Sequence, residues 1–220
     1  IQSVAINRSI SPSCGMERVR VYAESGMPEK AGRGLFAEAL LAAHPLLPVE
    51  EEGRLNDPRL RENFFERVFA FRRLKGLFRP RWGVGDLVRF HTAEKLLLMA
   101  HDPPSYQSLG RLVAGAKGIP REPLRADYSS GFMRALARIA TAKKHANVLQ
   151  HLAGYFKKDL PAAQKQELHG VIEDLRAGLV PLVVPVTLIR HYVRLYGVSY
   201  LEGQTYLSPH PKELMLRNHV

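Results

Sequence analysis

The sequence predicts an α+β protein in which a partial α/β domain, residues 1–80, precedes an all-helical domain, residues 81–220. Short β-branched runs at 1–6 and 19–22 indicate strands in the first domain. From Asp86 onward, apolar residues recur at helical spacing and no strand pattern stands out. Of the 220 residues 45% are hydrophobic, which is enough for a packed core and excludes a wholly disordered chain.

The first domain begins with these two strands, and the Gly- and Pro-containing stretch 26–34 is typical of a loop. Residues 35–43 are expected to form a helix. Asp57 and Pro58 supply a cap and a first-position proline for a long helix that ends near Phe78. The polar side of this helix is rich in arginine, so it is either the last element of the first domain or a basic strut between two domains.

The second domain is expected to hold about six helices joined by short loops. A longer loop rich in Gly, Pro and Arg is expected before Ser129. The predicted helices span 88–101, 105–116, 131–140, 141–160, 161–177 and 181–196.

The charge of the chain favours a polyanionic partner, nucleic acid before membrane. The 32 Lys and Arg exceed the 21 Asp and Glu, for a net charge of +11, and most of the excess follows Pro80. The longest apolar run, 179–189, contains two prolines and is too short to cross a bilayer, and no signal segment opens the chain. We therefore expect a soluble, cytoplasmic protein.

The predicted helix 141–160 separates an apolar side from a polar side that is a candidate surface for nucleic acid. A glycine at the centre of a polar face costs stability, but it lets a phosphate approach closely. The alternatives are a solvated lysine face with a tolerated glycine, or a close helix crossing. The candidate RNA-binding residues are Lys143, Lys144, Asn147, Gln150, His151, Gly154, Lys157 and Lys158.

Other chemistries have weaker support. The histidine pairs His91/His101 and His145/His151 lack the i, i+4 spacing of helical metal ligands, so buried or surface histidines are favoured. No nucleophile-elbow, phosphate-loop or dinucleotide motif occurs. The aromatic and basic segment 190–206 suits either stacking on RNA bases or core packing, and core packing is favoured.

A turn-forming segment, Ser11-Pro12-Ser13-Cys14-Gly15, follows the first strand. A thiolate there would ligate a metal or attack an electrophile, with the hydroxyls of Ser11 and Ser13 beside it. The alternative is an inert cysteine. Because Cys14 is the only cysteine, an internal disulfide and a multi-cysteine metal site made by this chain alone are excluded.

Two stretches of motifs resemble known families. The segment 8–22, with Gly34-Leu35-Phe36-Ala37 and the run 45–55, resembles the C-terminal half of the thiouracil desulfidase family. The rest is similar to the YbgA family of helical domains. That similarity is carried by His91-x3-Lys95, Tyr106-x2-Leu109-Gly110, the run 144–158, Pro181-Leu182-x2-Pro185, His191-Tyr192 and the run 206–214.

The resemblance implies an iron-sulfur enzyme that removes sulfur from thiolated uracil or thiouridine. Desulfidases hold a [4Fe-4S] cluster by three cysteines, and Cys14 matches one of these ligands. Ser11 matches the catalytic serine, with Ser13 as the second choice. The other cysteines belong to the half of the family pattern that is missing here, so we expect a longer parent protein and no activity from these residues alone. The basic helical domain would hold tRNA; the alternative is a non-catalytic nucleic-acid or protein adaptor.

Overall fold

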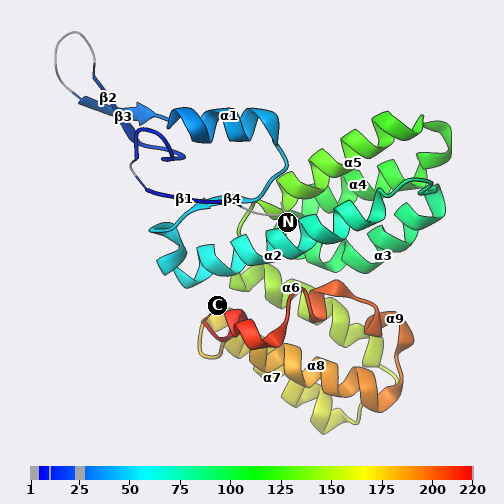
Figure 1. Ribbon diagram of the computed structural model, residues 1–220. Helices are drawn as coiled ribbons and strands as arrows, with labels where there is room; N and C mark the ends of the chain where they lie inside the picture. The colour runs from blue at the N-terminus through cyan, green and yellow to red at the C-terminus, as the bar shows by residue number, and fades with distance from the viewer. Residues whose placement is uncertain (1–4, 10, 23–27, 220) are drawn as a thin grey trace.

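The computed structural model describes residues 5–9, 11–22 and 28–219. The protein is largely helical and carries two small two-stranded sheets near its N-terminus. Figure 1 shows the sheets and α1 (Leu35–Ala43) on one side of α2 (Pro58–Leu77), and the other helices beyond it. This confirms the expected combination of a small β component and a large helical one; the boundary at residue 80 stays a prediction.

The N-terminal sheets are short. β1 (Ala5–Asn7) pairs in parallel with β4 (Val49–Glu51), and β2 (Val19–Tyr22) pairs antiparallel with β3 (Pro28–Gly32). The predicted strand at 19–22 and the helix at 35–43 are confirmed, while residues 1–4 of the first predicted strand lie outside the described residues. The predicted loop 26–34 is wrong over 28–32. Backbone pairing with β2 forms a strand there from residues of poor strand propensity.

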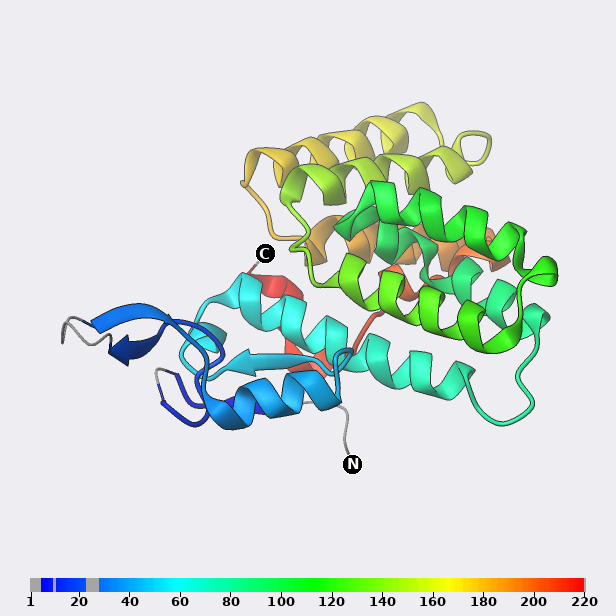
Figure 2. The ribbon, with the colours of Figure 1, turned by 90° about the horizontal axis from the view of Figure 1, so that it is seen from above.

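Helix α2 starts where its capping residues predict. The Asp57 carboxylate accepts hydrogen bonds from the amides of Arg59 at 2.8 Å and Leu60 at 3.1 Å, and Pro58 occupies the first turn, where no amide partner is needed. A 3₁₀ turn, Arg54–Asn56, leads into it. Phe64, Ala70 and Leu74 are buried, so α2 packs into the protein along its length. Figure 2 shows α2 between α1 and the helices that follow.

The helical part differs from prediction in two places. α5 (Arg121–Leu136) begins eight residues before the end of the loop expected up to Ser129, because Pro123 lies in the first turn, where a proline costs no hydrogen bond. The predicted helix 141–160 is interrupted: α6 (Ala142–Ala153) passes into a 3₁₀ turn, Gly154–Phe156. The other helices are α3 (Val84–His101), α4 (Pro103–Ala114), α7 (Ala162–Ala177), α8 (Val183–Tyr196) and α9 (Ser199–Glu202).

One cluster of buried apolar side chains joins α2 to the later helices. Leu97 of α3, Phe132 of α5, Leu149 of α6 and Ile189 of α8 are all fully buried in it. From Asp86 to His219, none of the described residues lies in a strand. No helix in the described ranges has the length and hydropathy that crossing a membrane requires.

Candidate functional site

The Cys14 turn is organised by the hydroxyl of Ser11. The Oγ atom of Ser11 accepts hydrogen bonds from the amides of Ser13 at 3.3 Å and Cys14 at 3.2 Å, and the Gly15 amide donates to the Ser11 carbonyl. Ser11 and Cys14 are partly buried, whereas Ser13 is exposed. The Ser11 hydroxyl thus contacts the backbone amide of Cys14, and the role of the hydroxyl and the thiol in chemistry stays a prediction.

Helix α1 holds the turn from the other side. The amides of Phe36 and Ala37, in the first turn of α1, donate to the Ser13 carbonyl at 2.9 and 3.2 Å. Gly34 makes this approach possible, because a Cβ there would lie 2.3 Å from the Ser13 carbonyl oxygen. The positive end of the α1 dipole thus faces the peptide directly before Cys14, an arrangement that favours negative charge nearby.

Two glutamates at the end of β4 complete the support. Glu51 accepts hydrogen bonds from the amides of Met16 at 2.7 Å and Glu17 at 3.4 Å, and Glu52 accepts from the Ser9 amide at 3.2 Å. Because β1 and β4 are parallel, their carboxyl ends meet at the edge where this loop leaves β1. Sequence reasoning did not assign these glutamates a role, because they lie between the predicted helices, in the run 45–55 that was noted only for its resemblance to the desulfidase family.

The polar side of α6 is exposed as predicted. Lys143, Asn147, His151 and Gly154 follow one another at helical spacing and all face solvent. Gly154 lies at the C-cap of α6, not at a mid-helix position, and nothing lies within 4 Å of where its Cβ would be. The surroundings of Gly154 therefore contradict a close helix crossing and leave either an open binding surface or a tolerated glycine.

The other predicted α6 residues are divided between surface and structural contacts. Lys157 and Lys158 are exposed beyond the 3₁₀ turn. Lys144 is partly buried, and its Nζ donates to the His101 carbonyl at 2.6 Å. Gln150 donates to the Glu173 carboxylate at 3.0 Å. Lys144 and Gln150 thus already have partners within the fold, and their role in RNA binding stays a prediction.

Two neighbouring pockets lie between the residues that flank the Cys14 turn and the start of α6. The first, of about 570 Å³, is lined by Ser9 and Met16 on either side of the turn. The second, of about 310 Å³, reaches Lys143. Asn63 of α2 and Ile139 line both, so the two pockets lie next to each other. The first pocket also contains the basic residues Arg18, Arg20, Lys30, Arg54 and Arg67.

A buried polar network forms part of the lining of the second pocket. Arg217 donates to Glu62 at 3.3 Å and to Glu66 at 2.9 Å, and the imidazole of His101 lies 3.0 Å from the second oxygen of Glu66. His101 Nδ1 faces the Arg138 carbonyl at 2.6 Å, so both ring nitrogens of His101 face acceptors. Sequence spacing missed this network, because Glu66 and His101 are 35 residues apart on different helices.

Burial and charge set the protonation of this network. Burial raises the pKa of Glu62 to about 8, with the neighbouring Glu66 carboxylate adding to the shift. Burial opposes ionisation of Glu66, but the His101 hydrogen bond and the Arg217 charge outweigh it and hold the pKa of Glu66 well below its usual value. Burial, together with the charge of Arg217, lowers the pKa of His145 to about 3. His145 is therefore neutral, with its Nδ1 3.0 Å from the Tyr206 hydroxyl.

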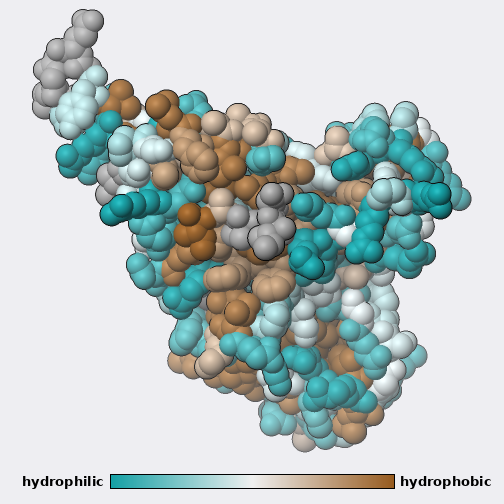
Figure 3. Space-filling model, in the orientation of Figure 1, coloured by the Kyte–Doolittle hydropathy of each residue, from teal (hydrophilic) through white to brown (hydrophobic). Residues whose placement is uncertain are grey.

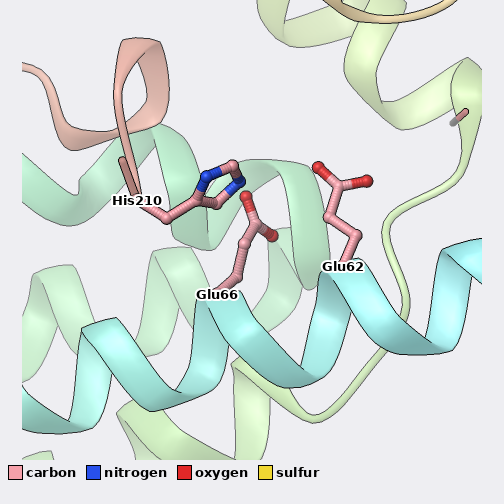
Figure 4. A group of neighbouring side chains, drawn as sticks. All are labelled: Glu62, Glu66 and His210. Carbon is pink, nitrogen blue, oxygen red and sulfur yellow. The ribbon is translucent and has the colours of Figure 1, made fainter. Parts of the chain in front are cut away.

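Figure 4 shows Glu62, Glu66 and His210 pointing toward one another. Each offers one ligand atom, and these atoms lie within 4.8 Å of one another, the spacing of a metal site. The Arg217 guanidinium, however, donates to an oxygen of Glu62, which its raised pKa keeps protonated at pH 7, and to the Glu66 carboxylate. The guanidinium supplies the positive charge that a metal ion would supply. Because Arg217 belongs to the C-terminal segment, the group is an ion-pair cluster that joins this segment to α2.

The aromatic residues of the segment 190–206 belong mainly to the core. Tyr192 and Tyr206 are buried at 4% and 0% exposure, which confirms the core interpretation for these two. Tyr200 is partly exposed and stacks on Tyr155 with ring centroids 5.4 Å apart. This stacked pair adjoins His151 at the end of the α6 polar side through an edge-on contact with Tyr155.

The residues of this chain do not by themselves fit a [4Fe-4S] cluster. Such a cluster needs three thiolate ligands to leave one iron open, and Cys14 is the only cysteine in the 220 residues. The supported, partly buried turn is suited to present one thiolate. The remaining ligands would have to come from outside these residues.

These features define a largely helical protein with a basic surface and a small N-terminal segment that presents a cysteine. Residues 95–211 match the family described as "Protein of unknown function (DUF1722)". The chain is 31% identical over 165 residues to the "Uncharacterized protein YbgA" of Escherichia coli (strain K12), across 74% of this chain and 98% of that protein. The chain therefore belongs to the DUF1722 family, of which YbgA is a relative. No solved structure matches it significantly.

Proposed function

We propose that this chain is a tRNA-binding protein whose Cys14 turn forms part of a desulfidase centre for thiolated uridine, completed by cysteines outside these residues. The observation that carries the proposal is the pair of neighbouring pockets that lie between Lys143 and the residues flanking the Cys14 turn, Ser9 and Met16. RNA held on the polar side of α6 would have a basic path to the turn. A thiolated base would then lie next to the one thiolate that the chain supplies.

The charges along this path suit a phosphate backbone. Arg67 lines the first pocket, and its Nε is buried without a hydrogen-bond partner in the part of the chain that the structure describes. Two of the three glutamates in the same pocket have partners: Glu50 pairs with Arg54 at 2.6 Å, and Glu51 accepts from backbone amides, while Glu17 has none among the described residues. Unpaired basic groups thus remain to contact phosphates, which supply most of the affinity in RNA binding.

A second candidate function, RNA binding without desulfuration, is favoured by the single cysteine. The two differ in their requirement for iron. The protein is incubated under anaerobic conditions with the other half of a desulfidase, which supplies the remaining cysteines. If it binds tRNA but acquires no iron, it is a binding adaptor. A protein that acquires iron and broad visible absorbance in a Cys14-dependent way belongs to a cluster enzyme.

The test of RNA binding replaces Lys143, Lys157 and Lys158 with Gln. The triple variant should bind tRNA more weakly, with the slope of log K against log salt reduced by about 0.7 to 0.9 for each phosphate that the protein no longer neutralises. The matched control replaces Lys75, Lys117 and Lys212, three exposed lysines away from α6 that carry the same total charge. An equal decrease in affinity in both variants, or no decrease in either, would contradict binding on α6.

The variant Gly154→Leu distinguishes a glycine on an RNA-binding surface from a tolerated glycine without a role in binding. The variant leaves the charge unchanged and meets no atom within 4 Å of its Cβ. A bulky side chain on a surface that RNA approaches should weaken tRNA binding while the melting temperature is kept. Wild-type affinity would assign Gly154 to the tolerated-glycine alternative.

A further inference from the structure

A separate pocket on α3 and α4 combines basic and aromatic groups that the Cys14 turn and the α6 lysines do not use. It encloses about 430 Å³. We call it the Lys95 pocket and define it by the side chains that line it. These are His91, Lys95, Tyr106, Gln107, Gly110 and Arg111.

His91 presents an unpaired nitrogen to this pocket. The side chain is 8% exposed, and its Nδ1 lies 3.1 Å from the hydroxyl of the fully buried Tyr128. No hydrogen bond to Nε2 is formed within the described residues. Nε2 lies 3.7 Å from the position that a Cβ on Gly110 would take, and Gly110 itself lines the pocket. The missing side chain at Gly110 thus leaves Nε2 accessible from α4.

The ring of His91 is neutral and can present Nε2 as a donor. Burial, with the Lys95 charge, lowers the pKa of His91 to about 4, so the ring is neutral at pH 7. Burial raises the pKa of Tyr128 well above its usual value, so its hydroxyl keeps its proton. In the tautomer in which Nδ1 accepts from the Tyr128 hydroxyl, the single ring proton is on Nε2. This tautomer presents an N–H group from a nearly buried side chain to the pocket.

The remaining lining is positive. Lys95 and Arg111 both line the pocket, and none of its described lining residues is a carboxylate. Burial lowers the pKa of Lys95, but the phenol oxygen of Tyr200 beside it raises that pKa overall, so Lys95 stays charged. The Nζ of Lys95 lies 5.0 Å from the Tyr200 ring centroid, which holds the ammonium group at the pocket.

The aromatic neighbours suit a nucleotide. Tyr200 stacks on Tyr155, which is 38% exposed, and Tyr155 contacts His151 on α6. A base beside a bound phosphate can stack on such a pair. The contacts from His151 through Tyr155 and Tyr200 to Lys95 link the polar side of α6 to the pocket.

We propose that the Lys95 pocket binds a phosphate group of the RNA that lies along α6, with Lys95 and Arg111 neutralising its charge and His91 Nε2 donating a hydrogen bond. That the phosphate belongs to RNA rests on the proposed function. That the pocket binds a phosphate at all rests only on the residues that line it. Free phosphate and an RNA phosphate share this chemistry, and the experiment separates them.

The first arm tests tRNA binding by the full chain. Lys95→Gln should weaken binding roughly tenfold, as expected when a charged hydrogen bond is removed, and should reduce the salt slope by about 0.7 to 0.9. Gly110→Ala should raise the melting temperature, because alanine favours a helix, yet weaken binding by covering His91 Nε2. The matched control is Gly170→Ala on α7, where nothing lies within 4 Å; it should raise the melting temperature with unchanged binding.

The second arm uses inorganic phosphate and the ¹⁵N resonances of the histidine rings. Phosphate should shift His91 Nε2 in the wild type and not in Gly110→Ala or Lys95→Gln. A shift of His91 with wild-type tRNA affinity in both variants would overturn the RNA source and assign the pocket to a small phosphate. Absence of the shift, together with unchanged tRNA binding, would overturn the pocket. If replacing the three α6 lysines leaves tRNA binding unchanged while Lys95→Gln weakens it, RNA binding on α6 is contradicted and RNA binding by the Lys95 pocket is supported.

Discussion

The two ends of this chain use large apolar residues in opposite ways. In the helical part, Phe132 of α5 and Leu149 of α6 are fully buried. In the N-terminal part, Leu35 and Phe36 of α1 are 78% and 54% exposed, and Ile6 of β1 is 54% exposed. Figure 3 shows hydrophobic side chains gathered on the surface over α1, whereas the ends of α4 and α5 are mainly hydrophilic.

The difference shows that the two parts are stabilised by different interactions. Parallel strands are normally covered on both faces, but β1 and β4 are only three residues long, and the buried residues of this pair include the polar Asn7, Glu50 and Glu51 while Ile6 is exposed. The Cys14 turn is held mainly by backbone hydrogen bonds to α1 and Glu51. Segments that bury little apolar surface open at lower free energy than a packed core. We therefore expect the turn to open locally while the helical core stays folded.

The largest expected effect compares two phenylalanines. Phe132→Ala should lower the free energy of unfolding by about 3 to 5 kcal/mol, because it leaves a cavity in a closed core. Phe36→Ala, at a half-exposed position, should cost roughly 0.5 kcal/mol or less. Urea unfolding followed by circular dichroism measures both. A destabilisation at Phe36 as large as that at Phe132 would show that α1 belongs to a closed core.

A smaller effect concerns the ion-pair cluster that joins α2 to the C-terminal segment. The pKa of Glu62 is raised to about 8, so the folded state binds its proton more tightly than the unfolded state does. Its contribution to stability is present below the unfolded value near 4.5 and is lost as the pH rises toward 8. Glu62→Gln, which keeps a neutral side chain, should therefore gain stability relative to the wild type by up to about 1.4 kcal/mol per pH unit over this range.

The control for this pH dependence is Glu173→Gln. Glu173 pairs with Arg176 on an exposed face of α7, with the side chains 52% and 46% exposed, so its contribution should be small at every pH. Thermal unfolding from pH 5 to pH 8 measures both variants against the wild type. A stability difference for Glu62→Gln that is flat with pH would show that Glu62 is ionised in the cluster.

Elements with local signals could be predicted from the sequence, and those that depend on distant contacts could not. The cap at Asp57 and the proline after it fixed the start of α2, because capping depends on adjacent residues. The strand β3 has no such signal; it forms because its backbone pairs with β2. The end of α6 at Gly154 was missed because the apolar periodicity continues through Phe156 into the 3₁₀ turn.

The same distinction holds for the candidate site. The Ser11 and Cys14 turn was predictable because its residues are neighbours in the sequence. The two neighbouring pockets between this turn and Lys143 were not, because Asn63 and Ile139, which line both, come from separate segments. The pairing of His91 with Tyr128, 37 residues away, was likewise beyond any spacing rule.

The most direct test of a path from α6 to the Cys14 turn is photo-crosslinking with tRNA that contains 4-thiouridine, whose thiolated base forms bonds only with residues in contact. The wild-type protein is irradiated in complex with this tRNA, and the crosslinked peptides are identified by mass spectrometry. We predict crosslinks in the segment 11–18 around Cys14 that disappear in the variant without Lys143, Lys157 and Lys158. Crosslinks confined to α7 and α8, or unchanged when the three lysines are replaced, would contradict such a path.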